Sequence, residues 1–296
     1  MSSISLKAYA KINLTLDVVS RRPDGYHNVE MIMQSVDLWD LITLQEIRQG
    51  IELDCNIPDL PRDEGNIAWR AAQLIKTEFN IEKGIRITIH KNIPIEAGLA
   101  GGSADCAAVL LGLNKIWNLG MDVKKLQALG KRLGADVPFC LVGGTALAEG
   151  IGDMLTPIKS KEDIWLVIIK PDFGVSTKEI YSKLKLEAIR NRPDNPRMIK
   201  YLETGDIQGI SSSLANVLEE VTIPMHPQIH RLKEELVAHG ALGALMSGSG
   251  PSVYGIFPDQ EAARKAVQPL RERHGQVFMA KTVSKGTSLP SPDFCL

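Results

Sequence analysis

The chain has 296 residues, of which 44% are apolar and 23% charged, and its formal net charge at pH 7 is -1. This length exceeds the roughly 100 to 200 residues of one ordinary domain, so we expect two domains or one two-lobed unit with a cleft. The composition is typical of globular proteins and excludes a disordered chain. With 34 Lys plus Arg against 35 Asp plus Glu and no block of like charge, nucleic acid is not an expected partner.

The sequence carries no signal for export or membrane insertion. The start MSSISLKAYAKINLTL lacks a basic segment followed by an apolar one, and no apolar run approaches the roughly 20 residues of a membrane span. The four cysteines, Cys55, Cys106, Cys140 and Cys295, form no CxxC pair and have no histidine at zinc-ligand spacing. We therefore expect a cytoplasmic protein with reduced thiols, no membrane partner and no metal held by cysteine.

The first 160 residues carry patterns of both strands and helices. Apolar stretches typical of strands run over 12–18, 29–44 and 85–89. Spacing typical of helices runs over 66–79, 104–117 and 123–133. Alternation in the first strand brings Lys11 and Asn13 to one polar face, and the Pro23-Asp24-Gly25 turn follows that strand.

A second lobe is expected from about residue 160, which divides the chain into lobes 1–160 and 161–296. The composition changes near 153–163, and a buried strand pattern runs from Ile164 to Pro171. The later patterns are a helix over 226–239, strands over 241–246 and 252–257, a helix over 260–274 and a strand over 277–283. This order favours an α+β sandwich with an antiparallel sheet, and the tail GTSLPSPDFCL is expected to lack regular structure.

A glycine-rich segment joins the strand over 85–89 to the helix expected from residue 104. Its residues are Pro94, Ile95, Glu96, Ala97, Gly98, Leu99, Ala100, Gly101, Gly102, Ser103 and Ala104. Unpaired backbone N–H groups in a first helical turn form a ready site for phosphate. The spacing matches neither GxxxxGK[ST] nor GxGxxG. The glycines alone leave two interpretations open, a phosphate site and a tight turn with Ser103 as the helix N-cap.

Three other features are ambiguous when each is considered alone. The run MSGSGPS over 246–252 fits a hairpin connection between two strands. Asp136, between Gly134-Ala135 and Val137-Pro138, fits a helix N-cap. Lys11, on an edge strand, would be a solvated charge. The histidines His90, His226, His230, His239 and His274 have no convincing metal-ligand spacing and fit surface positions.

The segments YAKINLTLDVVSRRPDGYH (9–27), PIEAGLAGGSADCAA (94–108) and MSGSGPSVYGIF (246–257) occur in this order along the chain. In order and spacing they resemble the three signature motifs of the GHMP kinases, which include galactokinase, homoserine kinase and mevalonate kinase. The resemblance implies a two-lobed α+β fold. Its N-terminal lobe would be like ribosomal protein S5, its C-terminal lobe would be a ferredoxin-like α/β sandwich, and the active site would lie in the cleft between them.

Within that family, the AKINL start and the RPDGYH, LGADVPF and GTALAEGIGD segments resemble the member whose acceptor carries a cytidylyl group. The implied activity is ATP-dependent phosphorylation of the 2-hydroxyl of 4-(cytidine 5′-diphospho)-2-C-methyl-D-erythritol, in the non-mevalonate pathway to isoprenoid precursors. The implied cofactors are ATP and Mg²⁺. The implied partners are these small molecules, and the protein would be a monomer or a weak homodimer.

The resemblance also implies roles for individual residues. The glycine-rich segment 94–104 would bind ATP, Asp136 would be the catalytic base and Lys11 its charged partner. A carboxylate within hydrogen-bond reach can accept the proton of the attacking hydroxyl. Asn13 would contact the substrate. One departure from many relatives is that Ser103 is followed by Ala104, so the loop ends in one hydroxyl residue instead of two.

A cytidine pocket is implied by the DGYH element. Cytosine would stack on Tyr26, His27 would read its polar edge, and Tyr181 would lie on the opposite side of the base. The alternatives are another GHMP kinase of the homoserine or mevalonate type, the related diphosphomevalonate decarboxylase, and a metabolite-sensing relative without catalysis. The aromatic and histidine pair argues against the first two, and the presence of both Lys11 and Asp136 argues against the third.

Overall fold

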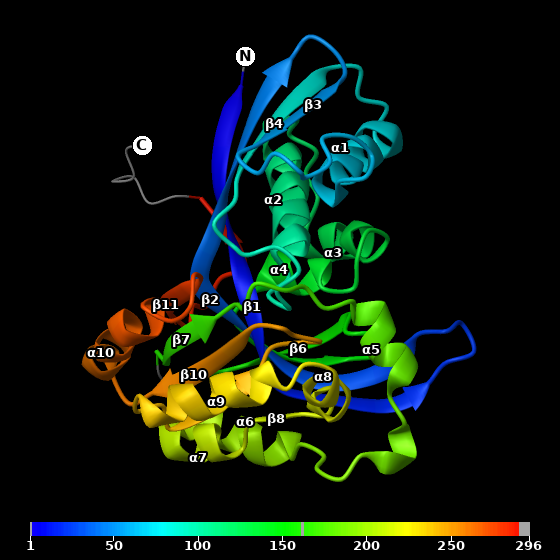
Figure 1. Ribbon diagram of the computed structural model, residues 1–296. Coiled ribbons are helices and arrows are strands. Elements are labelled where there is room, and N and C mark those ends of the chain that lie inside the picture. The colour runs from blue at the N-terminus through cyan, green and yellow to red at the C-terminus, as the bar shows by residue number, and fades with distance from the viewer. Residues whose placement is uncertain (1, 161–162, 290–296) are drawn as a thin grey trace.

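The computed structural model describes residues 2–160 and 163–289, which form two β-sheets with helices packed on them (Figure 1). Within these residues, no helix combines the length and the apolar character needed to cross a membrane. The chain leaves the first sheet after Ile158 and enters the second at Trp165. Two later strands return to the first sheet. A lobe boundary at residue 160 stays a prediction.

The first sheet is built around one long antiparallel hairpin, which extends through both halves of the molecule (Figure 1). Its strands are β1 (Ser3–Arg21) and β2 (His27–Ile47). The other strands of this sheet are β3 (Ile51–Cys55), β4 (Gly84–His90), β5 (Thr145–Glu149), β6 (Met154–Ile158), β8 (Ala215–Asn216) and β12 (Thr287–Ser288). The main path is β12-β1-β2-β4-β3, with β5 on β2, β6 on β5 and β8 on β1.

The strand β1 is an interior strand, contrary to the expectation of an edge strand for Lys11. It pairs with β2 along one side and with β8 and β12 on the other. At Lys11 itself, the backbone N–H donates to the carbonyl of Leu99 in the glycine-rich segment (3.1 Å). Register shifts between Tyr9 and Lys11 and between Asn13 and Thr15 mark bulges, which re-aim side chains next to functional sites. The Lys11 side chain is therefore buried instead of solvated.

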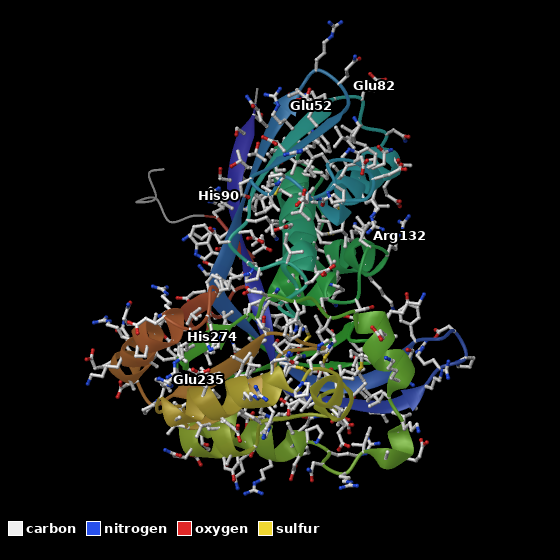
Figure 2. The ribbon with its side chains drawn as sticks, viewed as in Figure 1. Glu52, Glu82, His90, Arg132, Glu235 and His274 are labelled. Atoms are coloured by element: carbon white, nitrogen blue, oxygen red, sulfur yellow. The ribbon has the colours of Figure 1, made fainter. Side chains whose placement is uncertain are left out.

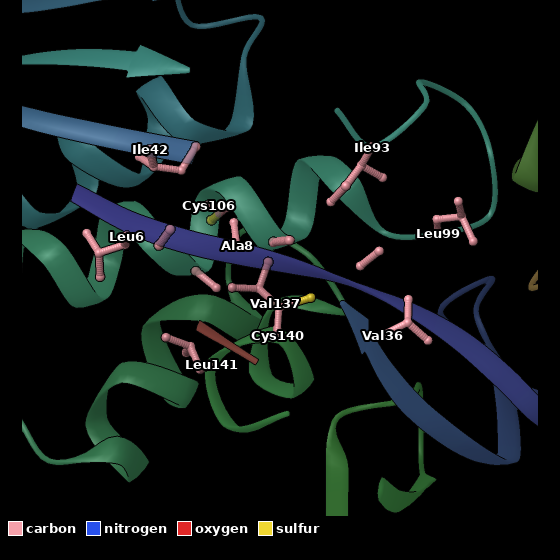
Figure 3. Close-up of a cluster of buried hydrophobic side chains, with 14 of the residues drawn as sticks. Leu6, Ala8, Val36, Ile42, Ile93, Leu99, Cys106, Val137, Cys140 and Leu141 are labelled. Carbon is pink, nitrogen blue, oxygen red and sulfur yellow. The ribbon is translucent and has the colours of Figure 1, made fainter. Parts of the chain in front are cut away.

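Four helices precede the second sheet: α1 (Ile67–Glu78), α2 (Gly101–Ile116), α3 (Val123–Lys131) and α4 (Val137–Val142). Helix α2 packs so closely on the hairpin that a side chain at Gly112 would not fit. A Cβ there would lie 2.4 Å from a methyl carbon of Leu44. Figure 3 shows side chains of β1 meeting those of α2 and α4, including Leu6, Cys106 and Val137. This core fixes the N-terminal ends of α2 and α4 near each other.

Helix α2 begins three residues before the predicted start at Ala104, so Ser103 is not its N-cap. The N-cap is Ala100, in the left-handed conformation with φ 56°, and it makes no side-chain capping bond. The prediction failed because Gly101, Gly102 and Ser103 have no apolar side chains and give no periodic signal. These three residues are nevertheless helical, because the turns that follow them are buried against the sheet and hold the helix in place.

The second sheet is antiparallel with the order β11-β7-β10-β9, as its sequence patterns predict. Its strands are β7 (Trp165–Ile169), β9 (Gly243–Met246), β10 (Val253–Phe257) and β11 (Val277–Lys281). The helices of this region are α5 (Thr177–Lys183), α6 (Asn195–Thr204), α7 (Ile207–Ser212), α8 (Glu219–Met225), α9 (Gln228–Ala238) and α10 (Gln260–Arg271), with a 3-10 turn at Leu186–Ala188. Alternate residues of β7 join different cores: Val167 packs with α9 and α10, and Ile168 with the core that includes the first sheet.

The C-terminal segment 282–288 crosses back from β11 to the first sheet. Val283 N–H donates to the carbonyl of Ser35 (3.0 Å), Tyr9 N–H donates to that of Gly286 (3.0 Å), and β12 pairs with β1. The prediction of a tail without regular structure is therefore wrong at Thr287–Ser288. Cys295 lies outside the described residues.

Candidate active site

The glycine-rich segment lies between β1 and the loop over residues 246–252. Ser247 Oγ donates to the carbonyl of Gly98 (3.0 Å), and Ser252 N–H donates to that of Ala97 (3.3 Å). Gly98 has φ 74°, and a Cβ there would lie 2.2 Å from the carbonyl oxygen of Ser247. Only glycine fits this contact. The two small-residue runs of the sequence thus meet each other, and the second is more than a hairpin connection.

The N-terminus of α2 is open to an anion. Its first-turn N–H groups, from Gly101 onward, lack intrahelical acceptors, and the N-cap Ala100 offers no side-chain oxygen to them. Gly102 is exposed and Ser103 half-buried. Unpaired N–H groups and the positive end of the helix dipole together favour phosphate.

Lys11, Asn13 and Asp136 come together beside this helix end. Lys11 Nζ donates to Asn13 Oδ1 (2.7 Å) and lies 3.8 Å from Asp136 Oδ2. The Lys11 side chain is 6% exposed and that of Asp136 is 29% exposed, so the carboxylate alone opens to solvent. Asp136 occupies the N-cap position of α4 but makes no capping bond. Its oxygens are therefore available to a proton donor from outside the chain.

The loop of the second lobe also reaches this pair. A Cβ on Gly248 would lie 3.5 Å from Lys11 Nζ. The buried side chain of Asn216 holds that loop by donating to the carbonyls of Met246 (2.9 Å) and Gly248 (2.8 Å). Sequence patterns gave no signal for Asn216, because β8 is only two residues long.

Of the three predicted cytidine residues, the structure brings two into contact. The rings of His27 and Tyr181 have centroids 5.2 Å apart and are tilted by 45°. Burial and the charge of Arg21 lower the pKa of His27 below its ordinary value, and burial and Asp136 raise the pKa of Tyr181. Tyr26 is 61% exposed and makes no ring contact with the described residues. The structure therefore brings His27 and Tyr181 together, and Tyr26 lies apart from them on the exposed surface.

A cavity of about 540 Å³ opens beside the glycine-rich segment. It is lined by Glu96, Gly98, Gly174, Val175, Ser176, Thr177, Glu179, Ser249 and Gly250. Thr177 at the start of α5 and Ser249 share a hydrogen bond (2.8 Å) across it. The cavity is thus bordered by both small-residue loops and by the start of α5. The isolated Thr177 carries no spacing signal and was not a candidate from the sequence, and Ser249 was noted only as part of the run over 246–252.

Three buried charges lie under the glycine-rich segment and were also missed. Lys91 Nζ contacts Asp40 Oδ2 (2.5 Å) and Asp105 Oδ2 (2.8 Å). Burial lowers the pKa of Lys91, but the two carboxylates outweigh it and raise the pKa overall; burial and Asp40 raise the pKa of Asp105 well above its ordinary value. The sequence did contain a signal that Lys91 is buried, because Lys91 continues the alternation of Ile87 and Ile89 on the buried face of β4.

The histidines are engaged on the surface or in local pairs. Figure 2 shows Glu235 of α9 and His274 pointing toward each other, and their hydrogen bond is 2.7 Å long. His239 Nδ1 bonds the carbonyl of Glu235, and the exposed His230 pairs with Glu234. Over residues 2–160 and 163–289, no group of three or more His, Cys, Asp or Glu side chains could hold a metal ion. Cys55, Cys106 and Cys140 are buried free thiols.

Comparison with known families assigns both lobes. A model described as the GHMP kinases N terminal domain matches residues 66–144, and one described as GHMP kinases C terminal matches residues 198–276. Among solved structures, a crystal structure of 4-(cytidine 5′-diphospho)-2C-methyl-D-erythritol kinase has a TM-score of 0.82 at 31% identity, covering 94% of this chain and 99% of that one. A homoserine kinase from Cytophaga hutchinsonii shares the fold, with a TM-score of 0.78 at 22% identity and 98% of each chain covered.

Two relatives are similar over almost the whole chain. The 4-diphosphocytidyl-2-C-methyl-D-erythritol kinase of Clostridium botulinum strain Alaska E43 is 48% identical over 280 residues, which cover 95% of this chain and 100% of that protein. The enzyme of the same name from Acetivibrio thermocellus is 49% identical over 283 residues, covering 96% of this chain and 100% of that protein. The predicted two-lobed α+β fold is confirmed, and the chain belongs to the 4-diphosphocytidyl-2-C-methyl-D-erythritol kinases, a branch of the GHMP kinases.

Proposed function

We propose that this chain transfers the γ-phosphoryl group of ATP to the 2-hydroxyl of 4-(cytidine 5′-diphospho)-2-C-methyl-D-erythritol. The products are ADP and the 2-phospho derivative, an intermediate on the way to isoprenoid precursors. The observation that carries this proposal is the position of the Asp136 carboxylate, which makes no capping bond to α4. It lies 3.8 Å from the buried Lys11 ammonium and next to the open N-terminus of α2.

In this mechanism the segment from Pro94 to Ala104 holds the ATP phosphates through the first-turn N–H groups of α2. Asp136 accepts the proton of the attacking hydroxyl, and the oxygen that loses it bonds to the γ-phosphorus as the bond to the ADP oxygen breaks. The Lys11 ammonium stabilises the negative charge that develops. Asn13 orients Lys11 through their hydrogen bond and contributes to acceptor binding.

The residues present fit a Mg²⁺ ion bound together with ATP. Mg²⁺ usually keeps several waters and takes its remaining ligands from phosphates and one or two protein groups, so it does not need a cage of carboxylates. Ser103 is half-buried in the first turn of α2, and no described residue hydrogen-bonds its hydroxyl, which is the group we propose as a ligand. When bound, the ion neutralises phosphate charge.

For the acceptor, we propose that cytosine binds at the pair His27 and Tyr181, with the exposed Tyr26 covering it. A neutral His27 offers one donor and one acceptor to the polar edge of the base. The contact of the two rings and the exposure of Tyr26 support this arrangement. The cytidylyl group would thereby distinguish the acceptor from mevalonate and homoserine, which carry no base.

The acceptor assignment is tested by incubating the purified protein with ATP and Mg²⁺ and measuring ADP release. We expect the highest kcat/KM with the cytidylyl acceptor and little turnover of mevalonate or homoserine. Faster turnover of either of these two would exclude the assignment.

We further propose a cytoplasmic enzyme that acts as a monomer or weak homodimer. The three described cysteines are buried free thiols, in keeping with a reducing compartment. Sedimentation at working concentration tests the oligomeric state.

A further inference from the structure

Asp40, Lys91 and Asp105 form a buried cluster outside the groups assigned to catalysis. Asp40 lies on β2, Lys91 directly follows β4, and Asp105 lies in the second turn of α2. Their side chains are 0%, 5% and 6% exposed. One ammonium donates to both carboxylates. Charges this deeply buried are costly unless paired, so this cluster requires a reason beyond filling space.

The cluster joins the two ends of the glycine-rich segment. Asp40 Oδ1 accepts from the N–H groups of Asn92 (2.6 Å) and Ile93 (2.8 Å), where the chain leaves β4 and enters the segment. Asp105 directly follows Ala104, the last residue of the segment. The Asp40 carboxylate therefore fixes the entry, Asp105 fixes the exit, and Lys91 holds the two together.

Lys91 itself is held in place. Its backbone N–H donates to Asn56 Oδ1 (2.7 Å), and its carbonyl accepts from Asn56 Nδ2 (3.1 Å). Its ammonium lies under the start of α2, since a Cβ on Gly101 would be 3.1 Å from Lys91 Nζ. A fixed cation thus lies beneath the helix end that faces the phosphates.

A purely structural role explains the cluster less well. Asp105 Oδ1 is buried and has no hydrogen-bond partner among the described residues. An apolar side chain would avoid that cost, and Ala108 and Val109, one turn further along the same face of α2, are buried apolar groups. Beyond the cluster itself, the hydrogen bonds of its side chains go to the Asn92 and Ile93 N–H groups at the entry of the loop.

We propose that Asp40, Lys91 and Asp105 are positioning residues that clamp the phosphate-binding loop in the conformation that receives ATP. This inference rests on the proposed function, in which that loop binds the nucleotide. Loosening the clamp weakens ATP binding and leaves acceptor binding unchanged, because His27 and Tyr181 lie on other elements.

The test compares Asp105→Asn and Asp40→Asn with the unaltered protein. Asn keeps the shape and a hydrogen-bond acceptor, so both variants are expected to fold. Calorimetry with ATP and Mg²⁺ should give a Kd raised by at least about tenfold, the effect of losing one charge-assisted hydrogen bond. The KM for ATP should rise with it, and the Kd of the cytidylyl acceptor should stay within about twofold.

Glu235→Gln is the matched control. Glu235 is a mostly buried carboxylate with two cationic partners, Arg273 and His274, in the second lobe (Figure 2). Its loss should lower Tm without changing the Kd of ATP, which separates stability from loop position.

Two results overturn the clamp: an ATP Kd within about twofold of the unaltered protein in both Asp variants, or an equal loss of ATP and acceptor affinity. If either Asn variant fails to fold, hydrogen exchange in the other decides, since the amides over 92–104 should exchange faster than those of α10. ATP binding is measured without turnover, so failure with the cytidylyl acceptor would count against the proposed acceptor and leave the clamp standing.

Discussion

Asp136 and Asp122 occupy the same position at the start of two neighbouring helices but differ in what their carboxylates do. Asp122 caps α3 by accepting from the N–H of Lys125 (2.8 Å), whereas Asp136 makes no capping bond to α4. A carboxylate that forgoes this bond gives up about 1 kcal/mol of helix stability. The proposed role of Asp136 as the base beside Lys11 would account for that loss.

Asp136→Asn should lower kcat by about 100- to 10,000-fold, because the amide cannot accept the hydroxyl proton. The Kd of ATP should hardly change, since Asp136 does not contact the phosphate loop in the proposed mechanism. Asp122→Asn is the control and should keep full activity. Activity of Asp136→Asn within about tenfold of the original would show that another group is the base.

The lowered pKa of His27 leads to a prediction for pH. Burial and Arg21 favour the neutral ring, so His27 stays neutral at pH 7 and gains a proton only below its ordinary value of 6.5. A protonated ring has no acceptor for the base, so the Kd of the cytidylyl acceptor should be constant from pH 8 to about 6.5 and rise at lower pH. Calorimetry without ATP measures this. His27→Asn should bind more weakly at pH 7, and the rise should disappear; a rise that persists would assign it to another group.

At the scale of elements, periodic patterns located the strands and helices whose apolar faces repeat without interruption. They identified α1, α3, α10 and the strands of the second sheet. They underestimated β1, which runs from Ser3 to Arg21, because its bulges change the phase of the alternation. Helices α5, α7 and α8 were missed since they have only six or seven residues each, and α6, with ten residues, was missed as well.

For the candidate site, the sequence identified the residues that stand in recognisable segments. Lys11, Asn13 and Asp136 lie together as expected, and the two small-residue loops touch. The Asp40–Lys91–Asp105 cluster was missed because periodicity gives the face on which a residue lies but not its partner across the fold. Its members are 51 and 14 residues apart in sequence.

The C-terminal strand β12 holds α4 in place through a hydrogen bond. Thr287 Oγ1 donates to the carbonyl of Cys140 (3.0 Å), near the end of α4. Thr287→Val should lower the free energy of unfolding by about 1 kcal/mol and reduce kcat with both KM values unchanged, because α4 carries Asp136. Thr287→Ser should restore both. Denaturant unfolding and steady-state kinetics check this, and a loss of stability with normal kcat would limit the strand to a structural role.

At the scale of the whole molecule, the two lobes meet through backbone contacts between their small-residue loops. Gly98 and Gly120 both have positive φ, 74° and 65°, but a Cβ on Gly98 would lie 2.2 Å from the Ser247 carbonyl, whereas one on Gly120 would have nothing within 4 Å. The two positions therefore separate the effect of the backbone conformation from that of the contact between lobes.

Gly120→Ala should cost about 1 kcal/mol of stability and leave kinetics unchanged. Gly98→Ala should cost more and also lower kcat/KM for ATP by at least about tenfold, because the loop must move away from Ser247. Thermal unfolding and steady-state kinetics measure the difference. Equal effects of the two substitutions would show that the lobe contact does not matter for nucleotide use.

The long hairpin has a consequence for which acceptors the enzyme accepts. Asn13 and Lys11 lie near the middle of β1, and His27 begins β2 opposite Arg21 at the far end of the same ribbon. A strand advances about 3.3 Å per residue and cannot stretch, so the ribbon sets a fixed spacing between Lys11 and His27, the residues that we propose for the reacting end and for the base. This spacing would select acceptors by their length. A cytidylyl compound with one phosphate in its linker instead of two would still fill the base pocket, but its hydroxyl would lie out of reach of Asp136. Such a compound should therefore act as an inhibitor.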